Sequence, residues 1–244
     1  MEPLRAGDPS RIGPYRLLRR LCADGMGVVF LARAPGGAVA AIKTVRPAFA
    51  EENGFRARFR REIDTARQVD SRWIVPLLDA DAGTPWLATT YVPGPSLAEA
   101  VDLSGPLPPT AVRVLGTLLT DALDAVHSAG LVHRDVKPGN ILLAPDGPRL
   151  IDFGIARTPD ATPLTTSGTV VGPPGFLSPE QAQAQIGPIG PPTDVFSLRC
   201  VLTYTATAIQ PYGTGPPARI LIRTVHEQPD PTALPENLKP VLQA

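Results

Sequence analysis

Four residues with clear chemical potential gather in one part of the chain. Asp135, Lys137 and Asn140 lie in the segment His-Arg-Asp-Val-Lys-Pro-Gly-Asn, and Asp152 follows in Ile-Asp-Phe-Gly. A carboxylate such as that of Asp135 can orient a substrate hydroxyl and accept its proton, and a nearby lysine can neutralise charge on a phosphoryl group. Asparagine and aspartate supply the hard oxygen ligands that suit Mg²⁺ or Mn²⁺. The set therefore indicates a phosphoryl-transfer site with Asn140 and Asp152 as metal ligands.

A second charged pair is predicted nearer the N-terminus. Lys43 ends the run Ala-Ala-Ile-Lys in a predicted strand, and a lysine in apolar surroundings needs an ionic partner. The next predicted element is a helix over residues 51–69, with Phe55 and Phe59 on its apolar stripe. Glu62 lies beside this stripe, so it leans towards the strands and can pair with Lys43.

Hydrophobic period and turn residues predict the elements that hold these side chains. Strands are predicted over residues 15–21, 28–34, 38–46, 74–79, 86–92, 141–143 and 149–151, and helices over residues 51–69, 111–129, 193–208 and 216–227. Pro93-Gly94-Pro95 interrupts the pattern, which indicates a hinge between two lobes. We therefore expect lobes over residues 12–92 and 93–244, preceded by a flexible N-terminus over residues 1–11.

Overall composition excludes several classes of partner and location. Lysine plus arginine equals aspartate plus glutamate at 23 each, so no overall basic field predicts binding to nucleic acid. No apolar run approaches the roughly 20 residues of a membrane helix, so no membrane span is expected. Cys22 and Cys200 are far apart and belong to no metal-ligand cluster, which favours a reduced, cytoplasmic setting.

The order and spacing of these motifs resemble a eukaryotic-type (Hanks-type) bacterial serine/threonine protein kinase, and in detail an actinobacterial catalytic domain. Ser178-Pro179-Glu180 stands where this family has Ala-Pro-Glu, and Asp194 begins a segment similar to the family's central buried helix. The resemblance runs from about residue 12 to the end of the chain. It implies an α+β, bilobed fold, with an antiparallel sheet and one helix in a small N-lobe and a larger, mostly helical C-lobe. It also implies transfer of the ATP γ-phosphoryl group to serine or threonine hydroxyls of proteins.

Within this resemblance each matching residue takes a role. The expected catalytic residues are Asp135, Lys137, Lys43 and Glu62, with Lys43 holding the α- and β-phosphates of ATP. The residues expected to contact ATP are Leu21, Val29, Ala41, Lys43, Thr90, Val92, Asn140 and Asp152. Thr90 and Val92 are expected to meet adenine through their backbone.

The resemblance also predicts modification and partners. Thr165 and Ser167 match positions at which related bacterial kinases autophosphorylate. Self-association is then expected for autophosphorylation in trans, and proteins are the expected substrates. His133 is predicted to be structural rather than catalytic, and Arg134 to organise the site around a phosphate.

Some positions depart from the family pattern. The glycine-rich loop reads Cys22-Ala23-Asp24-Gly25-Met26-Gly27, in which only the last glycine is in place, and Asp24 brings negative charge towards the nucleotide phosphates. Pro173 replaces the usual threonine, and Arg199 replaces a small residue of the central helix. The chain also ends before the helices that carry the family's partner for Glu180, so it is interpreted as C-terminally truncated. These departures leave an alternative open, a degenerate pseudokinase that serves as a nucleotide-binding or protein-interaction module.

Overall fold

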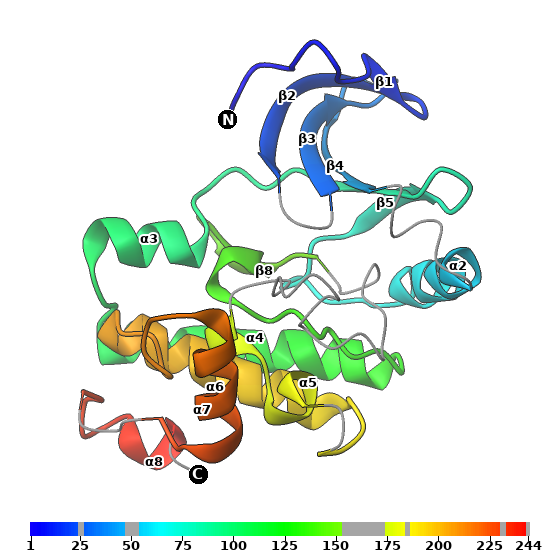
Figure 1. Cartoon of the computed structure of the whole chain (residues 1–244). Helices are drawn as coiled ribbons and strands as arrows, with labels where there is room; N and C mark the ends of the chain where they lie inside the picture. The colour runs from blue at the N-terminus through cyan, green and yellow to red at the C-terminus, as the bar shows by residue number, and fades with distance from the viewer. Residues whose placement is uncertain (24–26, 47–53, 153–173, 184–185, 230–232, 243–244) are drawn as a thin grey trace. The chain divides into compact units, whose positions relative to one another are not determined.

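The computed structural model describes the chain except for residues 24–26, 47–53, 153–173, 184–185, 230–232 and 243–244 (Figure 1). The chain divides into two compact units. The N-terminal unit comprises Met1–Gln68 and Val75–Pro93, and the C-terminal unit comprises Val69–Ile74 and Gly94–Ala244. The sequence predicts a boundary between residues 92 and 93, whereas the structure divides the chain one residue later and assigns Val69–Ile74 to the C-terminal unit.

The N-terminal unit contains a six-stranded antiparallel sheet of order β1-β2-β3-β4-β6-β5. The bounds of its elements are Arg11–Ile12 for β1, Tyr15–Ala23 for β2, Gly27–Arg33 for β3, Val39–Val45 for β4, Phe55–Ala66 for α2, Leu77–Asp81 for β5 and Trp86–Thr90 for β6. Alternate residues of the central strands, such as Phe30, Ala40 and Ile42, face one apolar core. The small antiparallel sheet that the sequence predicts is therefore confirmed.

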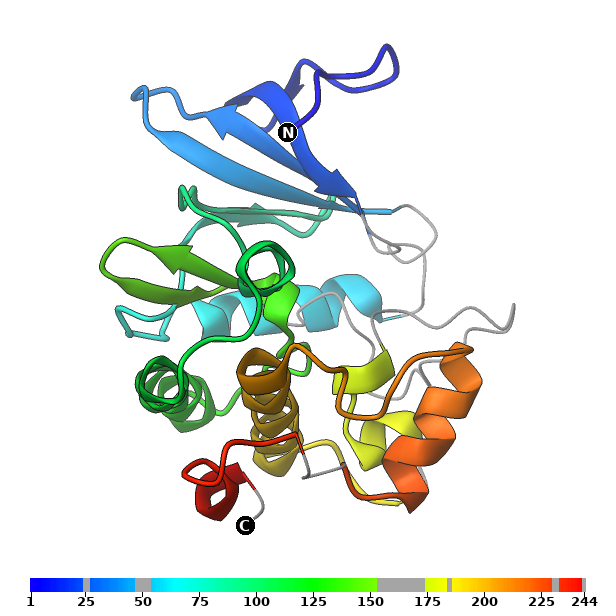
Figure 2. The same ribbon diagram turned by 90° about the vertical axis from the view of Figure 1, so that its left-hand side faces the viewer.

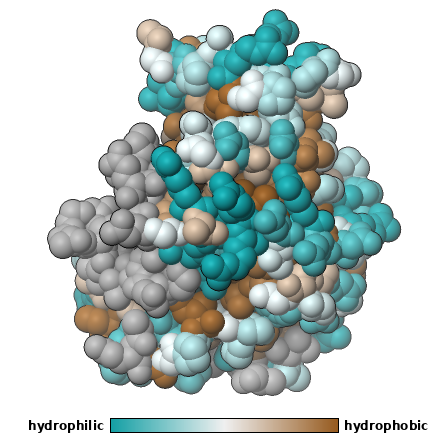
Figure 3. Space-filling view, turned by 90° about the vertical axis from the view of Figure 1, so that its right-hand side faces the viewer, coloured by the Kyte–Doolittle hydropathy of each residue, from teal (hydrophilic) through white to brown (hydrophobic). Residues whose placement is uncertain are grey.

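Helix α2 has two distinct faces. Phe55, Phe59 and Ile63 are buried, as their helical spacing predicts. Arg56 and Arg60 are exposed, and the surface on this side of the unit is strongly hydrophilic in Figure 3. The apolar stripe thus fixes which side of the helix turns inward, and with it the orientation of Glu62.

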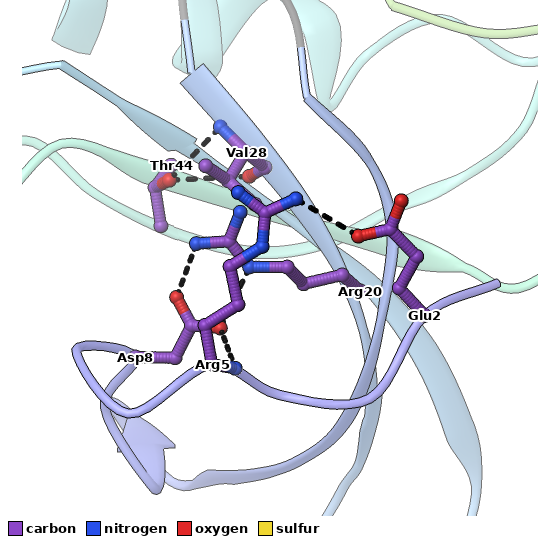
Figure 4. Close-up of polar contacts among 6 residues, drawn as sticks. All are labelled: Glu2, Arg5, Asp8, Arg20, Val28 and Thr44. Carbon is purple, nitrogen blue, oxygen red and sulfur yellow. Dashed lines mark hydrogen bonds and ion pairs between the residues drawn. The ribbon is translucent and has the colours of Figure 1, made fainter.

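The N-terminal segment differs from its prediction as a flexible extension. The backbone of Glu2 exchanges two hydrogen bonds of 2.9 Å with that of Arg20 on β2. The Asp8 carboxylate accepts hydrogen bonds from the Arg20 guanidinium (Figure 4). Leu4 packs against the core of the sheet. These contacts join residues that are far apart in sequence, so local periodicity gives no sign of them.

The C-terminal unit is mostly helical, as predicted. The bounds of its elements are Leu97–Ser104 for α3, Pro109–Ser128 for α4, Pro138–Asn140 for η1, Ile141–Ala144 for β7, Gly147–Leu150 for β8, Pro174–Phe176 for η3, Pro179–Ala182 for α5, Pro191–Thr207 for α6, Pro217–His226 for α7 and Lys239–Leu242 for α8. The prediction lacks α3. Its signal was present, because Ser96 and Glu99 form a capping box in which each side chain accepts a hydrogen bond from the other residue's backbone.

The core of this unit lies around α4 and α6, which pack side by side (Figures 1 and 2). Leu119, Val126 and Val201 are among its buried residues. The strand predicted from residue 74 begins later, at Leu77, because Ile74 instead pairs with Leu150 of β8. Among the helices that the structure describes, none combines the length and apolar character needed to cross a membrane.

Candidate active site

The segment between α4 and β7 brings three of the predicted site residues together. The Lys137 ammonium lies 2.9 Å from Asp135 Oδ2. The Asn140 side-chain amide donates to the same oxygen at 2.9 Å and to the Asp135 carbonyl at 2.8 Å. Two donors that bind the same oxygen thus hold the carboxylate of Asp135 in one orientation. This arrangement fits a group that must meet a hydroxyl in a defined geometry.

A buried aspartate of α6 holds the backbone of this segment through hydrogen bonds. Asp194 is fully buried, and its carboxylate accepts hydrogen bonds of 2.8 Å from the backbone N–H groups of His133 and Arg134. Arg134 has a φ of 63°, a left-handed conformation that is unfavourable for a residue with a side chain. The Gln181 side-chain amide donates to the Arg134 carbonyl at 2.8 Å. Both backbone polar groups of Arg134 are therefore hydrogen-bonded, which holds the unfavourable conformation directly before Asp135.

His133 links the two chain segments that carry the site. The backbone N–H of Asp135 donates to His133 Nδ1 at 3.3 Å, so the ring carries its proton on Nε2, which lies 3.1 Å from the Ile151 carbonyl. Burial lowers the pKa of His133, although the nearby Asp194 and Asp135 carboxylates act in the opposite direction. A neutral, buried ring bonded on both sides supports the prediction of a structural role.

The hairpin of β7 and β8 connects Asn140 to Asp152. The Ile151 N–H donates to the Asn140 carbonyl at 2.9 Å, which closes the hairpin at its base. The Leu150 N–H donates to the Trp73 carbonyl at 2.8 Å, so the hairpin is also tied to the segment before β5. Asp152 follows with a φ of 59°. The two predicted metal ligands thus flank one short, fastened hairpin.

The donor set of this hairpin fits a hard divalent cation. The Asn140 amide nitrogen is engaged with Asp135, which leaves its oxygen as the atom able to bind a metal. Asp152 adds a carboxylate. Among the described residues there is no cluster of three or more His, Cys, Asp or Glu side chains that could hold a metal by themselves. A site of two protein oxygens suits Mg²⁺, which commonly keeps water and substrate phosphates as its other ligands.

The predicted nucleotide residues of the N-terminal unit share one face of the sheet. Val29 pairs with Lys43 across β3 and β4, and Ala41 pairs with Thr89 of β6. Since neighbouring residues of a strand point to opposite faces, Val29, Ala41 and Lys43 lie on the face opposite Phe30. Glu62 is half-buried on α2. The strand pairing therefore gathers the predicted contacts for adenine and phosphate on one surface.

The remaining predicted contacts lie at the edges of this face. Leu21 is on β2, between two residues at which the register with β3 shifts. Thr90 ends β6, and Val92 follows it. Thr165 and Ser167 lie outside the described residues, as do Asp24 and Pro173.

Two departures from the family pattern do fall on described residues. Glu180, expected to lack its partner, accepts a hydrogen bond from the Thr193 hydroxyl at the start of α6. Arg199 is half-buried on α6, and its Nε is buried without a hydrogen-bond partner among the described residues. Glu180 thus has a hydrogen-bond donor within the unit, whereas the Arg199 Nε atom has none among the described residues.

Sequence reasoning missed several residues that support the site. His127, near the end of α4, places its Nε2 atom 2.8 Å from Asp194. Gln181 and Trp73 were not singled out either. Their contacts join residues of distant sequence position. For Gln181 one local signal existed, because Ser178 and Gln181 form a capping box at the start of α5.

Comparison with known proteins agrees with this geometry. The protein kinase domain family matches residues 15–239. The probable serine/threonine-protein kinase PkwA of Thermomonospora curvata is 46% identical over 246 aligned residues, which cover all of this chain and 33% of the relative. The serine/threonine-protein kinase AfsK of Streptomyces coelicolor is also 46% identical, over all of this chain and 31% of that protein. The chain thus spans about a third of the length of these relatives.

A solved structure gives the same result for the fold. The kinase domain of Mycobacterium tuberculosis PknI superimposes with a TM-score of 0.74 at 27% identity, covering 98% of this chain and 89% of that domain. The bilobed α+β fold implied by the resemblance is therefore confirmed. On the family match, the full-length similarity and the fold, the chain belongs to the protein kinase domain family, and its relatives are kinases of the bacterial serine/threonine type.

Proposed function

We propose that this chain is an active kinase domain that transfers the γ-phosphoryl group of ATP to serine or threonine hydroxyls of proteins. The observation that carries the proposal is the hydrogen-bonded group of Asp135, Lys137 and Asn140, in which two hydrogen bonds of 2.9 Å orient the Asp135 carboxylate. A degenerate pseudokinase is not favoured, because relatives that match the whole chain are named as serine/threonine-protein kinases.

In this proposal Asp135 accepts the proton of the substrate hydroxyl as the oxygen attacks phosphorus. Lys137, which lies beside that carboxylate, neutralises charge that develops on the transferred group. Asn140 and Asp152 would hold Mg²⁺, or Mn²⁺ in its place, through their side-chain oxygens. A metal held there would offset the negative charge of the nucleotide phosphates.

The nucleotide itself is assigned to the N-terminal unit. Lys43 binds the α- and β-phosphates, and Glu62 holds that lysine. Leu21, Val29 and Ala41 line the adenine side, with the backbone of Thr90 and Val92 at its edge. The support for these roles is the shared sheet face of Val29, Ala41 and Lys43.

The proposal also covers the partners of the chain and its location in the cell. Protein substrates are expected, together with self-association that allows autophosphorylation of Thr165 and Ser167 in trans. A cytoplasmic location is part of the proposal, because the cytoplasm supplies ATP. Neither nucleic acid nor membrane is proposed as a partner of this chain, whose net charge is zero.

The purified chain should incorporate radiolabel from γ-labelled ATP into itself or into a generic basic protein, with the label on phosphoserine and phosphothreonine. The Asp135→Asn variant should lose about 10²- to 10⁴-fold in rate, because it cannot accept the proton. Asp124→Asn, an exposed substitution on α4, should match the wild type. If wild type and Asp135→Asn label equally in folded samples, the proposed function is wrong.

A further inference from the structure

The end of the β2–β3 hairpin is built differently from what its sequence suggests. The first two positions of the predicted glycine loop, Cys22 and Ala23, remain part of β2 and pair with Val29 and Val28. The register shifts between Arg20 and Cys22, so Leu21 lies in a bulge. Leu21, a predicted nucleotide contact, therefore occupies an irregular point of β2. Its position depends on the contacts that hold the neighbouring residues of the strand.

The N-terminal segment fixes β2 directly before that bulge. Asp8 binds the Arg20 guanidinium with both carboxylate oxygens, one of them 2.6 Å from Nε, and the side chains are 5% and 15% exposed. The guanidinium also lies over the Phe30 ring at 5.7 Å. Arg20 holds the pKa of Asp8 at about 2, so this carboxylate remains charged at neutral pH. A bidentate pair of this kind restrains orientation as well as distance.

The same contact is reinforced on both sides (Figure 4). The backbone N–H of Arg5 donates to Asp8 at 2.7 Å, and the backbone of Glu2 pairs with that of Arg20. By contrast, the ion pair between the side chains of Glu2 and Arg5 is more than 60% exposed. Exposed pairs contribute little, so the restraint comes from Asp8 and from the backbone.

A second contact fixes the other side of the hairpin, at the start of β3. The Thr44 hydroxyl donates to the Val28 carbonyl at 3.1 Å and accepts from the Val28 N–H at 3.3 Å. Next to it, a Cβ atom added to Gly27 would lie only 1.7 Å from the Thr44 carbonyl oxygen. The two strands β3 and β4 therefore approach closely where the chain returns from the hairpin.

We propose that Asp8, Arg20 and Thr44 are positioning residues for ATP, which fix the strands that enter and leave the predicted nucleotide loop. Leu21 directly follows Arg20, which is bound by Asp8, and Val29 directly follows Val28, which is bound by Thr44. A shift of either strand would displace a predicted adenine contact. Because this loop lacks two of the family's glycines, fixed strand ends take over part of the task of presenting backbone to phosphate. The inference rests on the proposed function, since it assumes ATP as the ligand.

The test measures nucleotide binding at equilibrium, separately from phosphoryl transfer. Titration of a fluorescent ADP analogue with Mg²⁺ should give a Kd about tenfold higher for Asp8→Asn and for Thr44→Val than for the wild type. Glu2→Gln is the matched control, since it removes an exposed charge from the same segment and leaves its backbone pairing intact. Its Kd should equal that of the wild type.

Steady-state kinetics then separates positioning from general damage. The KM for ATP should rise in Asp8→Asn and Thr44→Val, while the KM for the protein substrate and the kcat at saturating ATP stay within about twofold. The double exchange Asp8→Arg with Arg20→Asp restores the ion pair, so it should recover at least part of the nucleotide affinity. Recovery would exclude a mere loss of folded protein.

The inference is wrong if folded Asp8→Asn and Thr44→Val bind the ADP analogue as tightly as the wild type. It is also wrong if kcat falls with no change in the KM for ATP. Should Asp8→Asn not fold, Thr44→Val alone decides between these outcomes. A wild type that binds the analogue without phosphorylating would overturn the proposed function and leave this test of binding intact.

Discussion

The catalytic segment of the C-terminal unit and the β2–β3 hairpin of the N-terminal unit hold their backbones in different ways. The first depends on side chains from distant helices, with Asp194 of α6 binding two consecutive N–H groups and Gln181 binding the carbonyl between them and Asp135. The second depends on strand pairing, one ion pair and one threonine. Buried charge-assisted hydrogen bonds fix individual peptide units, whereas strand pairing fixes only the register.

This difference predicts that the two regions tolerate sequence change differently. In the catalytic segment each predicted chemical residue is in place, since a lost donor would leave a buried acceptor unsatisfied. In the hairpin, Cys22 replaces a glycine and is accommodated as an ordinary paired residue of β2. Among the described residues of this hairpin, Gly27 is a position that a larger residue would not fit, because an added Cβ atom would lie 1.7 Å from the Thr44 carbonyl oxygen. Five substitutions test this contrast in the two regions, at Asn140, Asp194, Gly27, Gly36 and His133.

The largest effect is expected from Asn140→Asp. It removes both hydrogen bonds to Asp135 and places a second carboxylate within about 3 Å of the first, so that both cannot be ionised together. The proton shared by the pair disables the base, and kcat should fall by about 10²-fold or more at pH 7. The loss should shrink as the pH is raised, because deprotonation restores a charged Asp135. Steady-state kinetics from pH 6 to 9 measures this.

Nucleotide binding by Asn140→Asp tests whether the effect is confined to the catalytic segment. The Kd for the fluorescent ADP analogue without metal should remain within about twofold of the wild type, because the nucleotide residues of the N-terminal unit are untouched. The double variant Asp135→Asn with Asn140→Asp relieves the repulsion but removes the base, so its kcat should stay low at every pH. A kcat for Asn140→Asp equal to that of the wild type would contradict the role of this hydrogen-bonded group.

Asp194→Asn should have the next largest effect. The substitution removes the charge that binds two backbone N–H groups and His127 in a fully buried place. We expect a loss of about 2–3 kcal/mol in the free energy of unfolding and a fall in kcat, because Arg134 is no longer held in its left-handed conformation. Urea unfolding and kinetics measure both quantities. Asp124→Asn, on the exposed face of α4, should change neither by a comparable amount.

Gly27→Ala tests the close approach of the described strand β3 to β4 at the base of the hairpin. Since the new methyl group would meet backbone at 1.7 Å, β3 and β4 must move apart, at a cost of about 1–3 kcal/mol in unfolding free energy. Gly36→Ala, in the turn between the same two strands, has no neighbour within 4 Å of its new methyl group. Its effect should stay within about 0.5 kcal/mol. Equal effects of the two variants would show that the close approach at Thr44 is not required.

The sequence predicts the chemical residues and most of the strands and helices, but it does not predict the contacts that hold them in place. Chemical residue types at fixed spacing identify Asp135, Lys137, Asn140 and Asp152, and the family resemblance adds Val29, Ala41 and Lys43, whose shared sheet face follows from the strand register. The strands and long helices follow from hydrophobic period, with small errors at their ends. What local pattern cannot supply is the set of contacts between distant segments, such as Asp8 with Arg20, His127 with Asp194 and Trp73 with Leu150. These depend on the packed fold, and they are the contacts that hold the site.

The smallest expected effect is on the pH dependence of the free energy of unfolding, and it arises from His133 in the catalytic segment. Burial lowers the pKa of His133 below its ordinary value of 6.5, so the folded protein takes up this proton less readily than the unfolded chain. Stability from this group is therefore complete above about pH 6.5 and declines as the pH falls further, by up to about 1.4 kcal/mol per pH unit.

Comparing urea unfolding at pH 7.5 and 5.5 should show a loss of about 1 kcal/mol in the free energy of unfolding of the wild type that His133→Asn lacks. His226→Gln, exposed at the end of α7, should retain the wild-type dependence. If His133→Asn also retains it, the acid sensitivity arises elsewhere, and the ring that joins Asp135 to Ile151 does not need to be neutral for the segment to keep its place.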